Sequence, residues 1–270
     1  CEGLNLLVWH QFACSPKEMG LPGQEYFAGT HFNPNSTWWD KSGEFIAYLN
    51  RCQALLQRGL FVADACYYYG DHVPNFTQLK ASDPARVLPG YDYDVVTEEV
   101  ILTRMDVRDG RILLPDGMSY RALVLPDLAS ISLPVLRKIK DLVAGGATVI
   151  GPRPTKANSL SHGPDADPEV QRIASQLWAT EKSQGGGGRV IHGRSARDVF
   201  IADGLAPDFA TEAIGALDYI HRREGDIEIY FVCNSSDKSV EAACQFRVTG
   251  KAPELWDPIH GTIRQLTDWT

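Results

Sequence analysis

The amino-acid sequence predicts an α/β fold whose main part is a doubly wound, mostly parallel sheet. Between residues 59 and 208, short apolar runs typical of buried strands alternate with segments of helical period. This alternation is the pattern of parallel βαβ units. Residues 1–58 add one strand, loop and helix, and residues 209–270 carry short strands with polar turns. We therefore expect one β/α unit, then a Rossmann-like α/β domain, then a small antiparallel β domain.

The first unit starts with an apolar run at residues 4–10, which predicts a buried strand. His10 and Gln11 stand at the carboxyl end of this strand. A long loop at residues 22–40 follows and shows neither a helical nor a strand period. Residues 42–58 place their apolar side chains close to a 3.6-residue period, which predicts a helix.

The rest of the chain is assigned in the same way, from apolar runs, helical periods and turn residues. In the α/β domain we expect strands at residues 60–69, 111–115, 120–125, 147–151 and 189–192. We expect helices at residues 94–105, 133–144, 167–180 and 195–203, with Asp167 as the N-cap of the third. In the final β domain we expect strands at residues 216–221, 226–234, 240–248 and 254–257.

The bulk composition argues against some classes of binding partner. The 270 residues are 44% hydrophobic, enough to bury a sizeable core, and the net charge of −8 argues against nucleic-acid or anionic-membrane partners. The sequence shows no apolar run of about eighteen residues, the length of a membrane span, and no signal peptide is visible in it.

The six cysteines form no C-x-x-C pair, which disfavours a zinc ribbon or a thioredoxin site. Cys233 and Cys244 lie on predicted strands that could pair across a hairpin, so a disulfide and two free thiols both stay open. Phosphate-loop, H-E-x-x-H, G-x-G-x-x-G and G-x-S-x-G motifs are absent from the sequence. A hydrolase pair of Cys66 and His72 is one alternative, against simple burial of the cysteine.

The loop at residues 22–40 is the strongest functional signal. It combines glycine, proline, asparagine and aromatic residues with the Glu25 carboxylate and His31. Aromatic faces beside carboxylate and amide groups suit sugar rings, which present C–H faces and hydroxyl edges. The alternative is a loop that covers a core with its aromatic side chains.

Candidate site residues follow from this interpretation. Glycoside hydrolysis needs two carboxyl groups, and Glu25 could act with Asp64 or Asp71. His10 ends a strand, where (β/α) barrels keep their active groups. We predict Glu25 and His10 as catalytic residues and predict no metal ligands; the predicted substrate-binding residues are Gln11, His31, Trp38, Trp39, Asp64 and Tyr69.

Several motifs resemble the large bacterial α-L-rhamnosidases of glycoside hydrolase family 106, and together they cover nearly all of the chain. They are GQEYFAGTH at 23–31, NPN at 33–35, TWW at 37–39, YLNRCQ at 48–53, FVAD at 61–64, YDYD at 91–94, LLPDGMSY at 113–120 and ATVIGPRP at 147–154.

The resemblance implies a (β/α) barrel with catalytic carboxylates, then an amidotransferase-like or flavodoxin-like α/β domain, then β domains. On that basis residues 1–58 correspond to the last barrel strand, its loop and its helix, and residues 59–208 to the α/β domain without its cysteine nucleophile. The family's acid and base carboxylates would then precede Cys1. The resemblance also implies a periplasmic or secreted protein and allows for calcium, although no ligand set can be mapped.

Three functional hypotheses follow. The first is an α-L-rhamnosidase-like hydrolase that acts on terminal sugars of plant-type or bacterial glycans. The second is a non-catalytic carbohydrate-binding or structural module. The third is a small esterase that uses His10, Cys66 or His72. Because a lone barrel strand has two unpaired edges, we also expect residues 1–58 either to dock as an extra strand and helix on the α/β sheet or to pair with a second copy of the chain.

Overall fold

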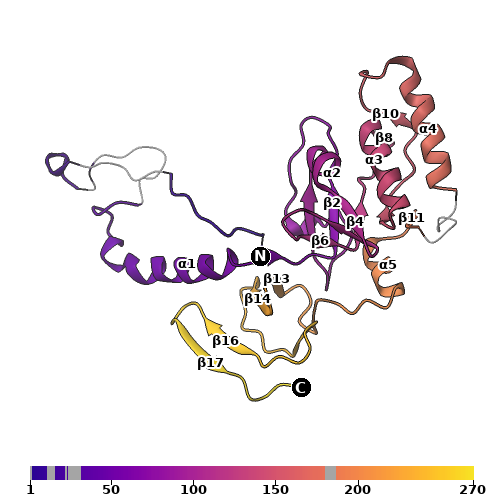
Figure 1. The fold of residues 1–270 in the computed structure, drawn as a ribbon. Coiled ribbons are helices and arrows are strands. Elements are labelled where there is room, and N and C mark those ends of the chain that lie inside the picture. The colour runs from indigo at the N-terminus through magenta and orange to yellow at the C-terminus, as the bar shows by residue number, and fades with distance from the viewer. Residues whose placement is uncertain (1, 11–15, 22, 24–31, 180–186) are drawn as a thin grey trace. The chain divides into compact units, whose positions relative to one another are not determined.

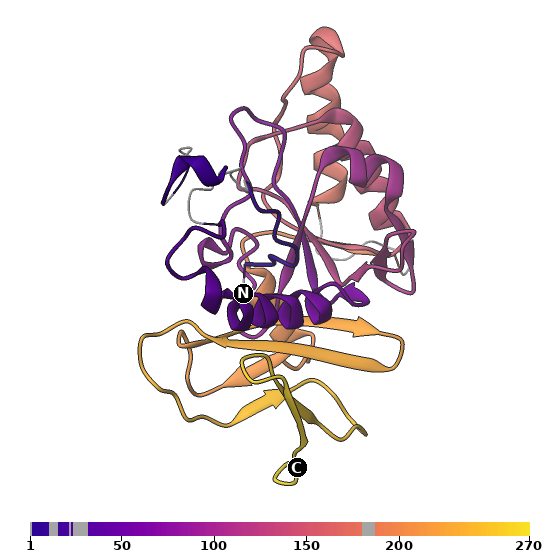
Figure 2. The ribbon, with the colours of Figure 1, turned by 90° about the vertical axis from the view of Figure 1, so that its left-hand side faces the viewer.

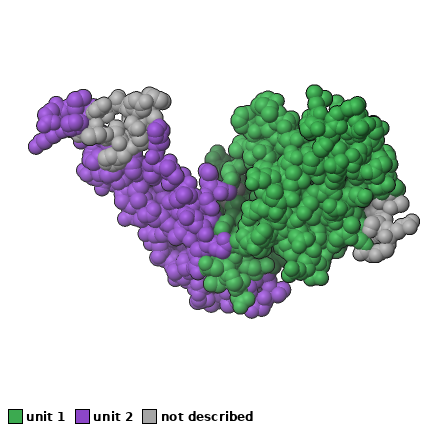
Figure 3. All heavy atoms as spheres, turned by 45° about the horizontal axis from the view of Figure 1, so that its top comes forward, with its two compact units in different colours: residues 1–2, 60–247 green, residues 3–59, 248–270 purple. Residues whose placement is uncertain are grey.

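The computed structural model describes residues 2–10, 16–21, 23, 32–179 and 187–270, and the chain separates into two compact units. Unit 1 comprises residues 1–2 and 60–247, and unit 2 comprises residues 3–59 and 248–270 (Figure 3). Unit 2 thus combines segments from both ends of the chain, a grouping that no pattern in the sequence suggested. The predicted boundaries at residues 58 and 208 stay predictions.

Unit 1 is built around a five-stranded sheet in which every neighbouring pair is parallel, in the order β11-β9-β7-β2-β3. Figure 1 labels β2 and β11 of this sheet. The mostly parallel sheet predicted from the alternating pattern is therefore confirmed. Its strands are rich in apolar residues because helices or loops cover both faces. They are β2 (Ala65–Tyr68), β3 (Tyr93–Val96), β7 (Ala122–Val124), β9 (Thr148–Ile150) and β11 (Arg189–Ile191).

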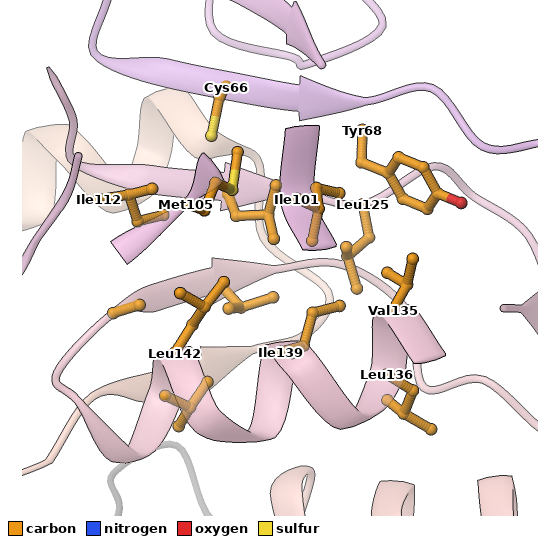
Figure 4. Close-up of a cluster of buried hydrophobic side chains, with 14 of the residues drawn as sticks. Cys66, Tyr68, Ile101, Met105, Ile112, Leu125, Val135, Leu136, Ile139 and Leu142 are labelled. Carbon is orange, nitrogen blue, oxygen red and sulfur yellow. The ribbon is translucent and has the colours of Figure 1, made fainter. Parts of the chain in front are cut away.

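Helices and loops cover both faces of this sheet. On one face, α2 (Glu98–Arg104), α3 (Leu133–Ala144) and α4 (Ala166–Leu177) contribute to one apolar core. On the other face, α5 (Ala196–Ala202) packs with residues 85–91 in a second core. Figure 4 shows the first core, where side chains of α3 such as Ile139 and Leu142 point toward Cys66 and Met105.

Two helix predictions need correction. The predicted helix at 94–105 is wrong in its first residues, because Tyr93–Val96 pairs in register with β2 and the helix begins at Glu98. Asp167 is not the N-cap of α4; Asp165 takes that position, and the Asp167 carboxylate accepts a hydrogen bond from the Ala157 N–H at 2.7 Å.

The start of α5 offers a test of local structure. Ser195 Oγ accepts the Asp198 backbone N–H at 3.0 Å and so satisfies one of the unpaired donors of the first turn. We expect Ser195→Ala to lower the free energy of unfolding by about 1 kcal/mol, measured by urea unfolding. Ser195→Thr keeps the hydroxyl and is the control; an equal loss in both variants would contradict the capping explanation.

Several small sheets, all antiparallel except one pair, complete unit 1. The largest is the hairpin of β13 and β14, orange in Figure 2, extended by β1. These strands are β1 (Leu60–Phe61), β13 (Leu217–Glu224) and β14 (Ile227–Asn234). The others are β4 (Asp106–Arg108), β5 (Arg111–Leu113) and β6 (Ser119–Tyr120) in one sheet, β12 (Phe209–Thr211) with β15 (Cys244–Phe246), and the parallel pair β8 (Ser130–Ile131) and β10 (Lys156–Ala157).

The strand pairing decides whether Cys233 and Cys244 could form a disulfide across a hairpin. Cys233 lies on β14, which pairs with β13, and Cys244 lies on β15, which pairs with β12. The two strands are not neighbours in one hairpin, and Cys233 and Cys244 are not joined by a disulfide. Among the described residues, no helix is both long enough and apolar enough to cross a membrane.

Unit 2 holds helix α1 (Ser42–Leu56) and the hairpin of β16 (Glu254–Asp257) and β17 (Thr262–Gln265). The hairpin turn is fixed to α1 by Arg51, whose Nη1 donates to the carbonyl oxygens of Pro258 and Ile259, both at 2.9 Å.

The strand predicted at residues 4–10 is wrong: this segment is exposed and forms no strand in the structure. A strand requires a neighbouring strand to pair its backbone groups. Here side chains of α1 replace that neighbour in part. The Leu7 N–H donates to Gln53 Oε1 at 2.6 Å, and Gln57 Nε2 donates to the Asn5 carbonyl at 2.8 Å.

Candidate functional site

An aromatic cluster forms in unit 2 from Trp9, Phe32, Trp38, Trp39 and Phe45. The rings of Trp9 and Phe32 are stacked, with centroids 4.2 Å apart and planes at 15°. Phe32 meets Trp39 edge-on at 5.4 Å, and Trp38 meets Phe45 edge-on at 6.3 Å. Both offset stacking and edge contacts are favourable geometries for aromatic rings.

Local structure explains why these rings meet. Asn33 is buried, and its Oδ1 accepts the Asn35 N–H at 2.8 Å, an Asx-type turn. A short 3-10 helix, Trp39–Lys41, then leads directly into α1, which carries Phe45. The turn and the helix start thus bring residues 32, 38, 39 and 45 together from a stretch of fourteen positions.

The cluster presents open ring surface. Trp9 is 48% exposed and Phe45 is 45% exposed, while Trp38 and Trp39 are half-buried. His10, predicted as catalytic, follows Trp9 directly and is exposed. Trp38 and Trp39, predicted as substrate-binding residues, both contact Phe32 in this cluster. Gln11, Glu25 and His31 lie outside the described residues.

Asp64, predicted as a substrate-binding residue inside a strand, lies in unit 1 just before β2. Its buried carboxylate accepts hydrogen bonds from Arg247 Nη2 at 2.9 and 3.1 Å and from Arg121 Nε at 3.3 Å. Two guanidinium groups thus already engage this carboxylate.

Asp64 belongs to a larger buried charge network. Arg247 also pairs with Asp208 at 3.4 Å, and Asp208 accepts a hydrogen bond from the Tyr230 hydroxyl at 2.9 Å. His221 lies between two carboxylates, with Nδ1 at 2.8 Å from Asp208 and Nε2 at 2.8 Å from Glu228. We define the buried charge network by its six members, Asp64, Asp208, His221, Glu228, Tyr230 and Arg247.

Glu228 is held by two neighbouring side chains. His221 Nε2 and Arg223 Nε each lie 2.8 Å from a Glu228 carboxylate oxygen. Burial raises the pKa of Glu228, but hydrogen bonds from Arg223 and His221 outweigh it and hold that pKa below its ordinary value. The His221 ring lies between the carboxylates of Asp208 and Glu228 and stacks on the Tyr230 ring, with centroids 3.9 Å apart.

Tyr69, the last predicted binding residue, is half-buried just after β2 and lines a cavity of about 160 Å³. We call this cavity the edge pocket because it lies at the carboxyl end of β2 and β3. Its nine lining residues are Tyr67, Tyr69, His72, Asn75, Phe76, Thr77, Gln78, Pro84 and Val95.

Comparison with known proteins identifies the family. The family model described as alpha-L-rhamnosidase, glycoside hydrolase family 106, matches residues 1–269. The chain belongs to this family. The resemblance seen in the sequence motifs is thereby confirmed.

Two relatives of this rhamnosidase family member show how far the likeness extends. A protein named "Putative beta-glucuronidase" from Formosa agariphila is 34% identical over 270 residues, which is 99% of this chain and 22% of that protein. The structure of a rhamnosidase from Novosphingobium sp. PP1Y matches with a TM-score of 0.77 and 30% identity, over 91% of this chain and 24% of that one. The chain thus spans about a quarter or less of these relatives.

The structure disfavours the esterase alternative for this family member. Cys66 Sγ is fully buried in the first core, and burial raises the pKa of its thiol. Successive residues of a strand point to opposite faces, and Tyr67, the next residue, lines the edge pocket together with His72. The Cys66 thiol therefore points away from His72.

Within the described ranges, no group of three or more His, Cys, Asp or Glu side chains could hold a metal ion.

Proposed function

We propose that this chain supplies the sugar-facing rim of an α-L-rhamnosidase-type glycoside hydrolase that acts on terminal sugars. The observation that carries the proposal is the aromatic cluster of unit 2. Its stacked and edge-on rings leave Trp9 and Phe45 about half exposed, as a surface for the C–H face of a sugar requires.

The polar groups of the same segment complete the proposal. Glu25 and His31 precede Phe32 in the chain, and His10 and Gln11 follow Trp9. We assign Glu25 as one of the two carboxyl groups of an inverting mechanism and the other three as hydrogen-bonding groups around the sugar. Because the relatives are about four times longer than this chain, we assign the second carboxyl group to a segment outside it.

We also propose that unit 1 is a doubly wound, flavodoxin-like scaffold. Numbered by appearance in the chain, its sheet strands run 2-1-3-4-5, the flavodoxin order. The buried charge network lies in this unit and supports a non-catalytic, structural role for it: its carboxylates are paired with Arg247, His221 and Arg121 and are not available to a substrate.

Nitrophenyl glycosides and nitrophenyl esters, assayed on the purified chain, test the proposal. Turnover of the α-L-rhamnoside that is abolished by Glu25→Gln supports a catalytic role of Glu25 and would place the second carboxyl group within the chain as well. Absence of turnover, together with a rise of the melting temperature in L-rhamnose, supports a rim that binds without catalysis. Ester turnover lost in His72→Ala would restore the esterase hypothesis and contradict the proposal.

We expect Trp38→Ala to weaken the affinity for L-rhamnose about 3- to 10-fold, because it removes a ring that positions Phe45 and Phe32. Isothermal titration calorimetry on the purified chain measures the change. Trp269→Ala is the control, since Trp269 is also exposed in unit 2 and lies outside the aromatic cluster. Equal affinities in the Trp38 variant and the original chain would contradict the rim.

A further inference from the structure

The edge pocket is formed by one face of the central sheet and a loop of unit 1. Tyr67 on β2 pairs in register with Val95 on β3, so both side chains lie on the same face. Tyr69, two residues beyond Tyr67, lines the same side. Residues 72 and 75–78 of the following loop, together with Pro84, supply the rest of the lining. Open α/β sheets bind ligands outside the carboxyl ends of their strands, and the edge pocket lies at that end of β2 and β3, beside the β2–β7 switch point and not at it.

The wall of the edge pocket is held in place by specific contacts. Asn75 Nδ2 donates to the carbonyl oxygens of Tyr69 and Gly70, at 3.2 and 3.0 Å. Gly70 has a φ of +85°, and a Cβ at this position would lie 3.3 Å from His72 Nδ1. A glycine here therefore permits both the left-handed turn and the close approach of the imidazole.

The chemistry of the lining selects a neutral, hydroxylated ligand. Its polar groups are two phenols, one imidazole, two carboxamides and one hydroxyl, and among the nine lining residues none is Asp, Glu, Lys or Arg. Burial raises the pKa of Tyr67, so its hydroxyl stays protonated and can donate. Phe76, Pro84 and Val95 supply apolar surface. Donors and acceptors beside an apolar wall match a ring with hydroxyl edges and a C–H face.

The volume of the edge pocket limits the size of that ligand. A cavity of about 160 Å³ corresponds to roughly five water molecules at about 30 Å³ each. Pockets for drug-sized ligands are larger, about 300–1,000 Å³. This volume matches a single sugar ring.

We propose that the edge pocket is a binding site for a single neutral sugar ring, held by hydrogen bonds from His72, Gln78 and the two tyrosine hydroxyls. The ring is either a free monosaccharide or the end residue of a longer glycan. This site belongs to unit 1 alone, and it does not depend on the aromatic cluster of unit 2 or on any catalytic role of Glu25.

Nuclear magnetic resonance on the ¹⁵N-labelled 270-residue chain tests the proposal. The probes are L-rhamnose, D-glucose, a rhamnose-terminated disaccharide and sodium D-glucuronate. We expect the neutral sugars to cause saturable shifts in the amides of residues 67–78 and 95. We expect glucuronate to bind about tenfold more weakly, because the pocket offers no cation to its carboxylate. Equal binding of disaccharide and monosaccharide indicates the end residue of a glycan; exclusion of the disaccharide indicates the free sugar.

Side-chain substitutions localise the site. His72→Ala and Gln78→Ala each remove a hydrogen-bonding group from the exposed loop and should weaken the sugar about 3- to 10-fold. His192→Ala is the matched control, because His192 is exposed and follows the carboxyl end of β11, the edge strand on the other side of the sheet.

Three outcomes would overturn the proposal: no saturable shift at residues 67–78, unchanged affinity in both loop variants, or glucuronate binding as tight as that of the neutral sugars. Shifts confined to residues 9 and 32–45 would also overturn it, while supporting the rim in unit 2. Shifts confined to residues 67–78 would support the edge pocket and count against the rim in unit 2. The two proposals can therefore fail independently.

Discussion

Arg247→Met is expected to lower the free energy of unfolding by about 3 kcal/mol, because it leaves buried carboxylates without their strongest counter-charge. Arg247 Nη2 contacts both oxygens of Asp64, at 2.9 and 3.1 Å, and lies 3.4 Å from Asp208. The side chains of Asp64 and Asp208 are 4% and 2% exposed. Arg121 stays beside Asp64, which places the loss at the lower end of the usual range for breaking a buried pair.

Urea unfolding of the full chain, followed by circular dichroism, measures this loss. Arg108→Met is the control, since Arg108 is exposed on β4 and should change stability by less than about 0.5 kcal/mol. Arg247→Lys keeps the charge but loses the planar fork, so we expect partial recovery. A loss below about 1 kcal/mol in Arg247→Met would show that the network is not stabilised by this residue.

Features with a local signal could be predicted from the sequence. Helix α3 has the predicted bounds, Leu133–Ala144, because its period, its proline at the start and its glycines at the end all lie within one segment. The parallel sheet followed from alternation over a long stretch. In the aromatic loop, Trp38 and Trp39 were selected as candidate binding residues by residue type alone. Their contacts with Phe32 and Phe45 join positions that are close together in the sequence.

Features that depend on distant partners could not be predicted. Asp64 and Arg247 are 183 positions apart, and no periodicity connects them. The apolar run at residues 4–10 has the composition of a strand, but pairing depends on a neighbouring strand, which a local pattern does not contain. The edge pocket could not be predicted either. The alternation of Tyr67 and Tyr69 is visible in the sequence, but their placement in one pocket with Gln78 depends on how the loop folds back.

Lys80→Met is expected to have the largest effect on stability, about 3–5 kcal/mol at pH 8. Lys80 is 9% exposed, and its Nζ lies 2.9 Å from Asp92 and 2.8 Å from Asp218. It also donates to the Tyr219 carbonyl at 2.7 Å and lies 4.9 Å from the centre of the Tyr219 ring. Removal of this ammonium leaves Asp92, which is 3% exposed, as a buried carboxylate without a cation.

The pH dependence distinguishes this explanation from a simple packing defect. Burial raises the pKa of Asp92 to about 6, against the attraction of Lys80, which lowers it. Because this folded-state pKa exceeds the unfolded value of about 3.9, the contribution of Asp92 to stability is fully present below pH 4 and is lost as the pH rises through about 6. Without Lys80 the pKa of Asp92 rises further. The loss of unfolding free energy caused by Lys80→Met should therefore become smaller as the pH falls from 8 to 5.

Thermal and urea unfolding at pH 5 and pH 8 measure the difference, with Lys140→Met on the exposed side of α3 as the control. Adding Asp92→Asn to Lys80→Met removes the buried charge, and we expect the double variant to recover most of the stability at pH 8 but little at pH 5. The loss of unfolding free energy could instead be equal at both pH values and unchanged by Asp92→Asn. That result would show that Lys80 stabilises the fold by packing its alkyl chain against Tyr219.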